Sequence, residues 1–217
     1  MNPSSHFAIA IDGPAASGKS TIARLLAVRL GLVMVNSGAM YRAVTWKVLE
    51  SKVDPADTAA VIDLLGNIDI QCGSDGIAST IHINGVDPGD ALRAPEINAN
   101  VSTIAAIPEV RDVLIHLQRA YLDHSSVVME GRDIGSVVFP DTPYKIYVDA
   151  AEHVRAARRK KIGEEDSVAA RDAADSKRAT APLVIPQGAT ILDNSELGIE
   201  EGVEVALGIL QAQGLSL

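Results

Sequence analysis

Nothing in this sequence of 217 residues constrains the fold more than the segment Gly13–Ser20. The segment reads GPAASGKS and fits the phosphate-binding pattern G-x-x-x-x-G-K-S/T at every fixed position. An apolar run, Phe7–Ile11, precedes the segment, and apolar residues at helical spacing follow it over Ser20–Leu30. A strand, a glycine-rich loop and a helix in this order predict an α/β fold of the P-loop NTPase type, with a parallel sheet flanked by helices.

The residue types in this loop suit the binding of a nucleoside triphosphate. Glycine lets the backbone approach phosphate oxygens closely, and successive amide N–H groups form a pocket for anions. The helix that follows adds its positive N-terminal end. Lys19 is placed to reach the terminal phosphates, and the Ser20 hydroxyl to ligate Mg²⁺. We therefore predict that the nucleoside triphosphate, which the resemblance described below implies to be ATP, is bound with Mg²⁺ by Gly13, Pro14, Ala15, Ala16, Ser17, Gly18, Lys19, Ser20 and Thr21.

Other apolar runs extend the same alternation of strands and helices. Helical spacing is expected at about 39–49 and resumes over about 95–122. Short apolar runs predict further buried parallel strands at 32–35, 127–129, 145–148 and 190–193. The whole chain therefore reads as a single domain with a core of 1–58 and 94–217.

The stretch of about 59–93 has a different character. Ile68–Ile70 and Ile77–Ile83 alternate apolar and polar residues, and Asn84-Gly85 is a pair typical of tight hairpin turns. This pattern predicts a small antiparallel sheet inserted into the parallel core. An ordinary surface hairpin without a function is the alternative.

A second segment, at about 155–178, carries many charges and little apolar periodicity. We interpret it as a mobile, solvated lid that closes over the donor nucleotide and excludes water. A charged helix that merely faces solvent would have the same composition.

The overall charge limits the classes of partner. The formal net charge is −9 and the isoelectric point is about 5.0, which disfavours binding to nucleic acid. The single cysteine, Cys72, excludes an intramolecular disulfide framework, and no apolar run is long enough to cross a bilayer. We therefore expect a cytoplasmic protein whose anionic ligands are held by local clusters of arginines and amides.

A P-loop leaves three classes open: a switch GTPase, a motor or transport ATPase, and a kinase for small substrates. The guanine-reading patterns N-K-x-D and T-K-x-D are absent from the sequence. Val127–Glu130 resembles the acidic strand end of motor ATPases, but the chain is short for that class.

Two further loops favour the kinase. Asn36–Arg42 and Glu130–Gly135 each follow an apolar strand and bring an arginine to the edge of the sheet where ligands bind. The planar guanidinium suits a phosphomonoester, because it donates two parallel hydrogen bonds. An arginine that only solvates the surface is the competing interpretation for each loop.

These segments resemble the bacterial cytidylate kinases of the nucleoside monophosphate kinase superfamily. The resemblance is carried, in order along the chain, by Ile11–Pro14, Asn36–Arg42, Gly131–Pro140, Arg171-Asp172 and Asp175–Leu183. It implies transfer of the γ-phosphoryl group of ATP to CMP or dCMP, with the inserted sheet as part of the monophosphate-binding region. It also implies a monomer.

The resemblance implies roles for individual residues. Lys19, Arg132 and Arg178 would be catalytic, with Arg178 bridging the phosphates. Arg42 and Arg132 would hold the acceptor phosphate. The residues expected to bind CMP are Ser37, Tyr41, Arg42, Ser102, Arg111, Arg132, Asp133, Arg171 and Asp175. Among these, Ser102, Arg111 and Asp133 would contact the cytosine ring, and Arg171 and Asp175 would contact the sugar.

Three features depart from the commonest pattern of that family. Asn36 stands where an aspartate is usual, Ser20 replaces a glycine found in several members, and the segment between Arg159 and Arg171 is short. Two other functions stay open: a monophosphate kinase for another base, such as uridylate, and a nucleotide-dependent regulatory switch.

Overall fold

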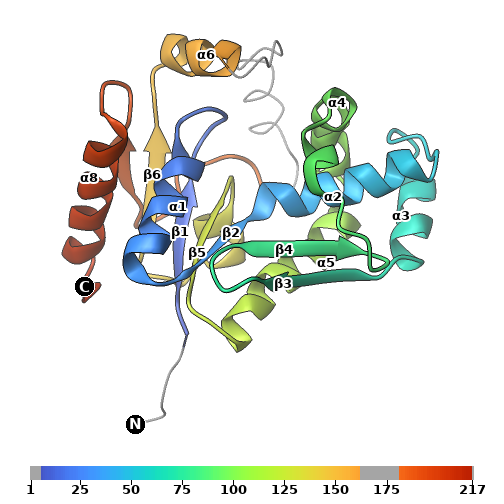
Figure 1. Ribbon diagram of the computed structural model, residues 1–217, viewed down its shortest axis with the longest axis horizontal. Helices are drawn as coiled ribbons and strands as arrows, with labels where there is room; N and C mark the ends of the chain where they lie inside the picture. Colours follow the sequence, from blue (N-terminus) through green and yellow to red (C-terminus); the bar gives the residue numbers. More distant parts are fainter. Residues whose placement is uncertain (1–5, 162–180, 217) are drawn as a thin grey trace.

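A sheet of five parallel strands forms the centre of the molecule (Figure 1). The computed structural model describes residues 6–161 and 181–216. The strand order is β2-β5-β1-β6-β7, and every pair is parallel, as predicted. The strands are β1 (Ala8–Asp12), β2 (Val33–Asn36), β5 (Val127–Gly131), β6 (Lys145–Asp149) and β7 (Thr190–Asp193). All five carboxyl ends therefore meet at one edge, where ligands of open α/β sheets bind.

Strand β1 shows how the two faces of the sheet are filled. Ile9 and Ile11 point to one face, where they pack with residues of α1 (Lys19–Leu30) and α8 (Ile199–Ala212). Ala8 and Ala10 belong to the cluster on the opposite face. The small side chains leave room there for the π-helical turn η3 (Ile134–Val138) and the short 3₁₀ turn η2 (Ala120–Asp123). The sequence analysis did not anticipate α8.

A second hydrophobic cluster lies beside the sheet, at the right of Figure 1. Most of its buried members come from α2, α4, α5 and the turn between the last two helices, with one residue from α3 and two, Ile81 and Ile83, from strand β4. This packing unit is therefore larger than the inserted sheet alone. The helices are α2 (Ser37–Glu50), α3 (Thr58–Gly66), α4 (Pro95–Ile104) and α5 (Pro108–Arg119), with the 3₁₀ turn η1 (Gly89–Arg93) before α4.

The predicted antiparallel sheet is present as β3 (Ile70–Ser74) and β4 (Ser79–Ile83). The first strand begins at Ile70, later than predicted, and its ladder with β4 continues through Gly73 and Ser74. Asn84 and Gly85 form the expected tight turn, with φ of 52° and 78°. Helix α3 was not predicted in this stretch.

Proline divides the long helical stretch that was expected over 95–122. Helix α4 ends at Ile104, and α5 begins at Pro108. Proline lacks an N–H group and disfavours helical conformation in the residue before it, so it suits the first position of a new helix. In the part of the chain that the structure describes, no helix is long and apolar enough to span a membrane.

Two glycines of the α1–α8 layer should respond to alanine in opposite ways. Gly31 caps α1 with φ of 64° in open space, so Gly31→Ala should lower the free energy of unfolding by about 1 kcal/mol. Gly208 lies exposed within α8, also in open space, so Gly208→Ala should raise it by about 0.5–1 kcal/mol. Urea denaturation of both variants measures the difference, and equal shifts would contradict this account of the cap.

Candidate active site

The P-loop joins β1 to α1 and is shaped by two glycines. Gly13 and Gly18 have φ of 150° and 97°, where a side chain is strained. A Cβ atom at Gly13 would lie 2.1 Å from the Val148 carbonyl oxygen, and one at Gly18 would lie 2.2 Å from Asn194 Nδ2. Both positions therefore admit only glycine.

Side chains from two other elements hold the carbonyl groups of the P-loop. Asn194, which follows β7, donates from Nδ2 to the Ser17 carbonyl over 2.7 Å, and Arg158 donates to the same oxygen over 3.0 Å. Arg155 donates to the Ala15 carbonyl over 3.3 Å. In a trans peptide the N–H points opposite to the carbonyl, so the anchored Ser17 carbonyl turns the Gly18 N–H away from Asn194. These contacts orient the loop backbone for an anion.

Arg155 and Arg158 belong to α6 (Glu152–Lys161), the beginning of the segment that was predicted to be a solvated lid. That prediction is wrong for Arg155 and Arg159, which are buried against the body of the protein. Arginines that hydrogen-bond to backbone carbonyls can be buried, so charge content alone misled the sequence analysis. The remainder of the predicted lid, from residue 162 on, lies outside the described residues, as do Arg171, Asp175 and Arg178.

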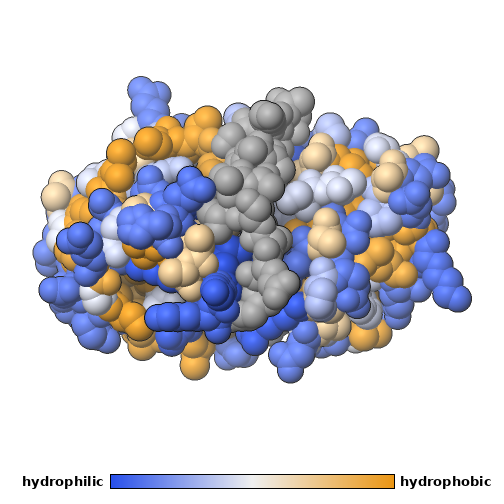
Figure 2. Space-filling view, turned by 90° about the horizontal axis from the view of Figure 1, so that it is seen from above, coloured by the Kyte–Doolittle hydropathy of each residue, from blue (hydrophilic) through white to orange (hydrophobic). Residues whose placement is uncertain are grey.

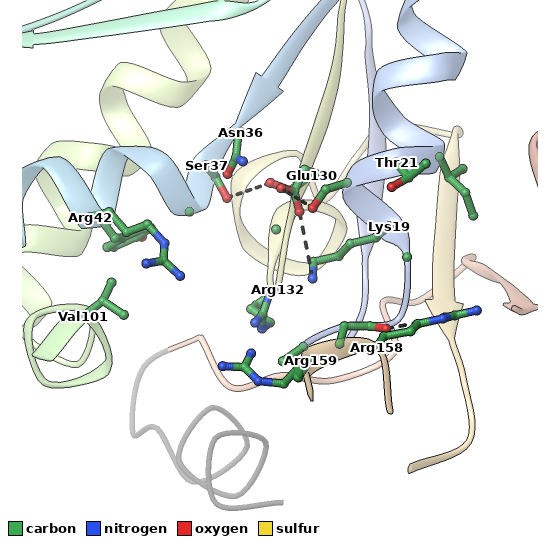
Figure 3. Close-up of a pocket in the computed structure, with 18 of the residues that line it drawn as sticks. Lys19, Thr21, Asn36, Ser37, Arg42, Val101, Glu130, Arg132, Arg158 and Arg159 are labelled. Atoms are coloured by element: carbon green, nitrogen blue, oxygen red, sulfur yellow. Dashed lines mark hydrogen bonds and ion pairs between the residues drawn. The ribbon is translucent and has the colours of Figure 1, made fainter. Parts of the chain in front are cut away.

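Glu130, near the end of β5, contacts both Lys19 and Ser20. Ser20 Oγ donates to Glu130 Oε1 over 2.9 Å, and Lys19 Nζ lies 4.0 Å from Oε2 (Figure 3). Lys19 also donates to the Pro14 carbonyl over 3.1 Å. Lys19 and Glu130 are both buried. The sequence analysis noted Glu130 as an acidic strand end but did not assign it to the site.

The loop after β2 runs straight into α2. Asn36 Oδ1 accepts a hydrogen bond from the Ala39 N–H over 3.0 Å and caps the helix. An amide can replace the family's aspartate in this contact, because only one acceptor oxygen is needed. Ser37 Oγ donates to the Glu130 carbonyl over 2.8 Å, and a Cβ at Gly131 would lie 2.6 Å from that hydroxyl. Because residue 131 is glycine, Ser37 at the start of α2 can approach the loop that follows β5.

Arg42 points from α2 toward α4. Its Nη1 donates to Asn98 Oδ1 over 2.5 Å and to the Leu92 carbonyl over 3.2 Å. Asn98 is one helical turn before Ser102, which lines the same cavity. The arginine is therefore held by the helix that was expected to contact the base.

A buried ion pair lines the same cavity as the P-loop. Arg111 of α5 donates to Asp133, and the two residues are only 2% and 4% exposed. Arg111 also donates to the Ala105 carbonyl over 3.2 Å and lies over the Tyr41 ring, 5.4 Å from its centroid. Two charges so thoroughly desolvated are costly to bury, and each would be destabilising without the other.

One cavity of about 630 Å³ joins these parts. Among the residues that the structure describes, its wall contains seven basic and only two acidic side chains, although the whole chain has a net charge of −9. Figure 3 shows Arg42, Lys19, Arg132 and Arg159 around the same space. The basic residues are Lys19, Arg42, Arg111, Arg132, Arg158, Arg159 and Lys161, and the acidic ones are Glu130 and Asp133. An anionic ligand fits this concentration of positive charge.

The structure brings together most of the predicted site residues. The cavity is lined by Ala15, Ala16, Gly18, Lys19, Ser20 and Thr21 of the P-loop, and by Ser37, Tyr41, Arg42, Ser102, Arg111, Arg132 and Asp133 of the expected acceptor site. Gly13, Pro14 and Ser17 shape the loop without lining the cavity. Arg158, Arg159 and Asn194 are additional lining residues that the sequence analysis missed. On the face drawn in Figure 2, strongly hydrophilic surface lies in the middle, and apolar residues are scattered to either side.

Fold and site together define a P-loop phosphotransferase with a basic cavity beside the P-loop. A family model described as cytidylate kinase matches residues 9–212, so the chain belongs to the cytidylate kinase family and is a nucleoside monophosphate kinase. Curated relatives named cytidylate kinase include those of three bacteria. That of Clostridium botulinum is 39% identical, over 95% of this chain and 98% of its own length. Those of Caldanaerobacter subterraneus and Corynebacterium efficiens are 40% and 42% identical, over 90% and 92% of this chain and 91% and 92% of theirs.

Asp12, the last residue of β1, is a wholly buried carboxyl group beside this site. Burial raises its pKa from 3.8 to about 7, and the negative charge of Asp133 acts in the same direction. Hydrogen bonds from the Gly135 and Ile134 N–H groups and the charge of Lys19 lower the pKa but do not offset the burial. The side chain of Lys145 also passes close by, next to Gly135.

This raised pKa predicts a pH-dependent stability difference. The folded protein binds the Asp12 proton more tightly than the unfolded chain, so this contribution is complete below pH 4 and is lost as the pH rises to about 7. The free energy of unfolding of the wild type should therefore fall relative to Asp12→Asn over that range, by at most about 1.4 kcal/mol per pH unit. Urea denaturation of both proteins between pH 5 and 8 measures it. A difference that does not change with pH would contradict the assignment.

Proposed function

We propose that the chain transfers the γ-phosphoryl group of ATP to CMP or dCMP, giving ADP and CDP or dCDP. The observation that carries the proposal is the single cavity that runs from the P-loop to the buried pair of Arg111 and Asp133. One end of this cavity suits phosphates and the other end suits a polar base, so donor and acceptor can meet within it.

The donor phosphates would lie on the N-terminal end of α1, against the amide groups of the P-loop and Lys19. The Ser20 hydroxyl and the Glu130 carboxylate, 2.9 Å apart, are hard oxygen ligands that fit Mg²⁺. Among the described residues, no group of three or more His, Cys, Asp or Glu side chains could hold a metal by itself. Mg²⁺ would therefore also need phosphate oxygens, and when bound it would neutralise charge on them.

Cytosine recognition falls to Asp133, Arg111 and Ser102. Cytosine offers an exocyclic amine as donor and a ring nitrogen and carbonyl as acceptors. The Asp133 carboxylate can accept from the amine, while Arg111 and Ser102 can donate to the acceptors. The ion pair between Asp133 and Arg111 already fixes both groups before the ligand arrives, so little reorganisation is needed.

The remaining roles concern phosphates and sugar. Arg42 and Arg132 would hold the acceptor phosphate, which is largely ionised at neutral pH and needs no catalytic base. Transfer then depends on alignment and on charge stabilisation by Lys19, Arg132 and Arg178. Arg178 lies outside the described residues, as do Arg171 and Asp175, which we propose as sugar contacts. We also propose that the segment of about 155–178 acts as the lid, with Ser37 and Tyr41 completing the acceptor site.

Removing the charge of Lys19 should abolish most turnover without unfolding the protein. Lys19→Met keeps the length of the buried side chain, and loss of one preorganised charge of this kind lowers kcat by about 100- to 1000-fold. A coupled assay for ADP formation measures it. Lys47→Met is the matched control, because Lys47 pairs with Glu50 on the surface of α2, 2.6 Å apart. Near-normal turnover by Lys19→Met would exclude the proposed donor site.

A panel of nucleoside monophosphates tests the acceptor. We expect turnover with CMP and dCMP to exceed that with UMP by at least about 100-fold in kcat/KM, because uracil would turn a carbonyl toward Asp133 and leave a buried acceptor unpaired. The same coupled assay gives the ratio. Equal use of UMP would favour a uridylate kinase, and ATP binding without any acceptor-dependent turnover would favour a regulatory switch.

A further inference from the structure

Asp12 connects the donor loop to the acceptor loop although it does not line the cavity. It directly precedes Gly13, the first residue of the P-loop, and its side chain is fully buried. Its Oδ1 accepts a hydrogen bond from the Ile134 N–H and its Oδ2 accepts one from the Gly135 N–H, each over 2.7 Å. Ile134 directly follows Asp133, so both Asp12 oxygens accept hydrogen bonds from the loop next to the proposed acceptor residues.

The backbone hydrogen bonds between β1 and β5 do not hold this loop in place. The parallel pairing of β1 with β5 ends where Asp12 faces Gly131. Arg132 and Asp133 lie beyond the last pair, in the turn between β5 and η3. Among the backbone hydrogen bonds, the Val137 and Val138 N–H groups donate to the Asp133 carbonyl over 2.9 and 3.1 Å, which closes the turn upon itself. It is Asp12 that ties this turn to β1.

The turn also has little room to settle elsewhere. A Cβ atom at Gly135 would lie 3.1 Å from Asp12 Oδ2 and 3.2 Å from both Lys145 Cδ and Pro186 Cγ. Glycine therefore lets the Gly135 N–H approach the carboxylate closely, between neighbours on three sides.

The P-loop has anchors that do not involve the Asp12 side chain. Asn194, Arg158 and Arg155 hold its carbonyl groups from β7 and α6. A change at the Asp12 side chain should therefore displace the acceptor loop more than the donor loop.

We infer that Asp12 is a positioning residue that places Arg132 and Asp133 for the acceptor nucleotide through its two hydrogen bonds to the following turn. The inference rests on the proposed transfer to CMP. It assigns to the residue before the P-loop an effect on the acceptor rather than on the donor.

Asp12→Asn tests this inference with little change in size. The asparagine keeps one acceptor oxygen but turns an NH₂ group toward the other N–H, so one of the two hydrogen bonds is lost. Thr142→Val is the matched control, because the Thr142 hydroxyl donates to the Ala8 carbonyl over 2.5 Å at the opposite end of the same strand. Calorimetric Kd values for CMP and ATP, and kcat and KM for both substrates, are measured at pH 8, above the raised pKa of Asp12.

For Asp12→Asn we expect the Kd and KM for CMP to rise by about 10- to 100-fold, because a shift of about 1 Å in a positioning group has an effect of this size. The Kd for ATP should stay within about twofold, and Thr142→Val should change neither affinity beyond that. Gly135→Ala, which crowds the same contact from the other side, should show the same selective loss for CMP.

Unchanged CMP affinity in Asp12→Asn would overturn the inference, and so would an equal loss for CMP and ATP. If Asp12→Asn unfolds at the assay temperature, the Gly135→Ala result decides between the same outcomes. A wild-type protein without CMP-dependent turnover would refute the proposed function. A wild type that turns CMP over beside unaffected variants would refute only the role of Asp12.

Discussion

The parallel pairing of β1 with β5 is the constraint on which the site depends. It brings the P-loop after β1 and the Arg132–Asp133 turn after β5 to neighbouring positions at one edge of the sheet. Residues 110 positions apart in the chain thereby come into hydrogen-bond contact, as Ser20 and Glu130 do. The buried apolar residues on both faces of these strands stabilise this register, because a shift by one residue would turn them to the wrong face.

The two halves of the proposed site use different groups to bind an anion. The donor half uses backbone amides and the end of a helix, with glycines at positions where a side chain would collide. The proposed acceptor half uses charged side chains from α2, α5 and the turn after β5, and two of them, Arg111 and Asp133, are deeply buried. Buried charges of this kind are stable only as partners, which explains why Arg111 contacts Asp133, Tyr41 and a carbonyl at once.

This difference also explains what the sequence could reveal. The P-loop, the parallel sheet and the tight turn at Asn84-Gly85 were predictable, because each depends on local spacing or on residues with unusual backbone freedom. Helix α3 was not predicted, because the alternating pattern that follows it led the whole stretch of about 59–93 to be interpreted as strands. Arg155 and Arg159 were taken for solvated residues, since composition gives no sign that a guanidinium will be buried. That of Arg155 donates to the carbonyls of Ala15 and Ala150.

The residues proposed to bind the acceptor could not be identified from local sequence patterns. Ser102 and Arg111 lie on separate helices, and nothing in the spacing of either helix singles them out. Only the resemblance to cytidylate kinases pointed to them, and the fold then placed both on the wall of one cavity with Asp133. Asn194 and Glu130 had a weaker signal, since Glu130 lies near the end of the buried strand β5 and Asn194 directly follows the edge strand β7, which is buried only at Leu192. A polar residue at such a strand end, next to a P-loop, is therefore a better candidate than composition alone suggests.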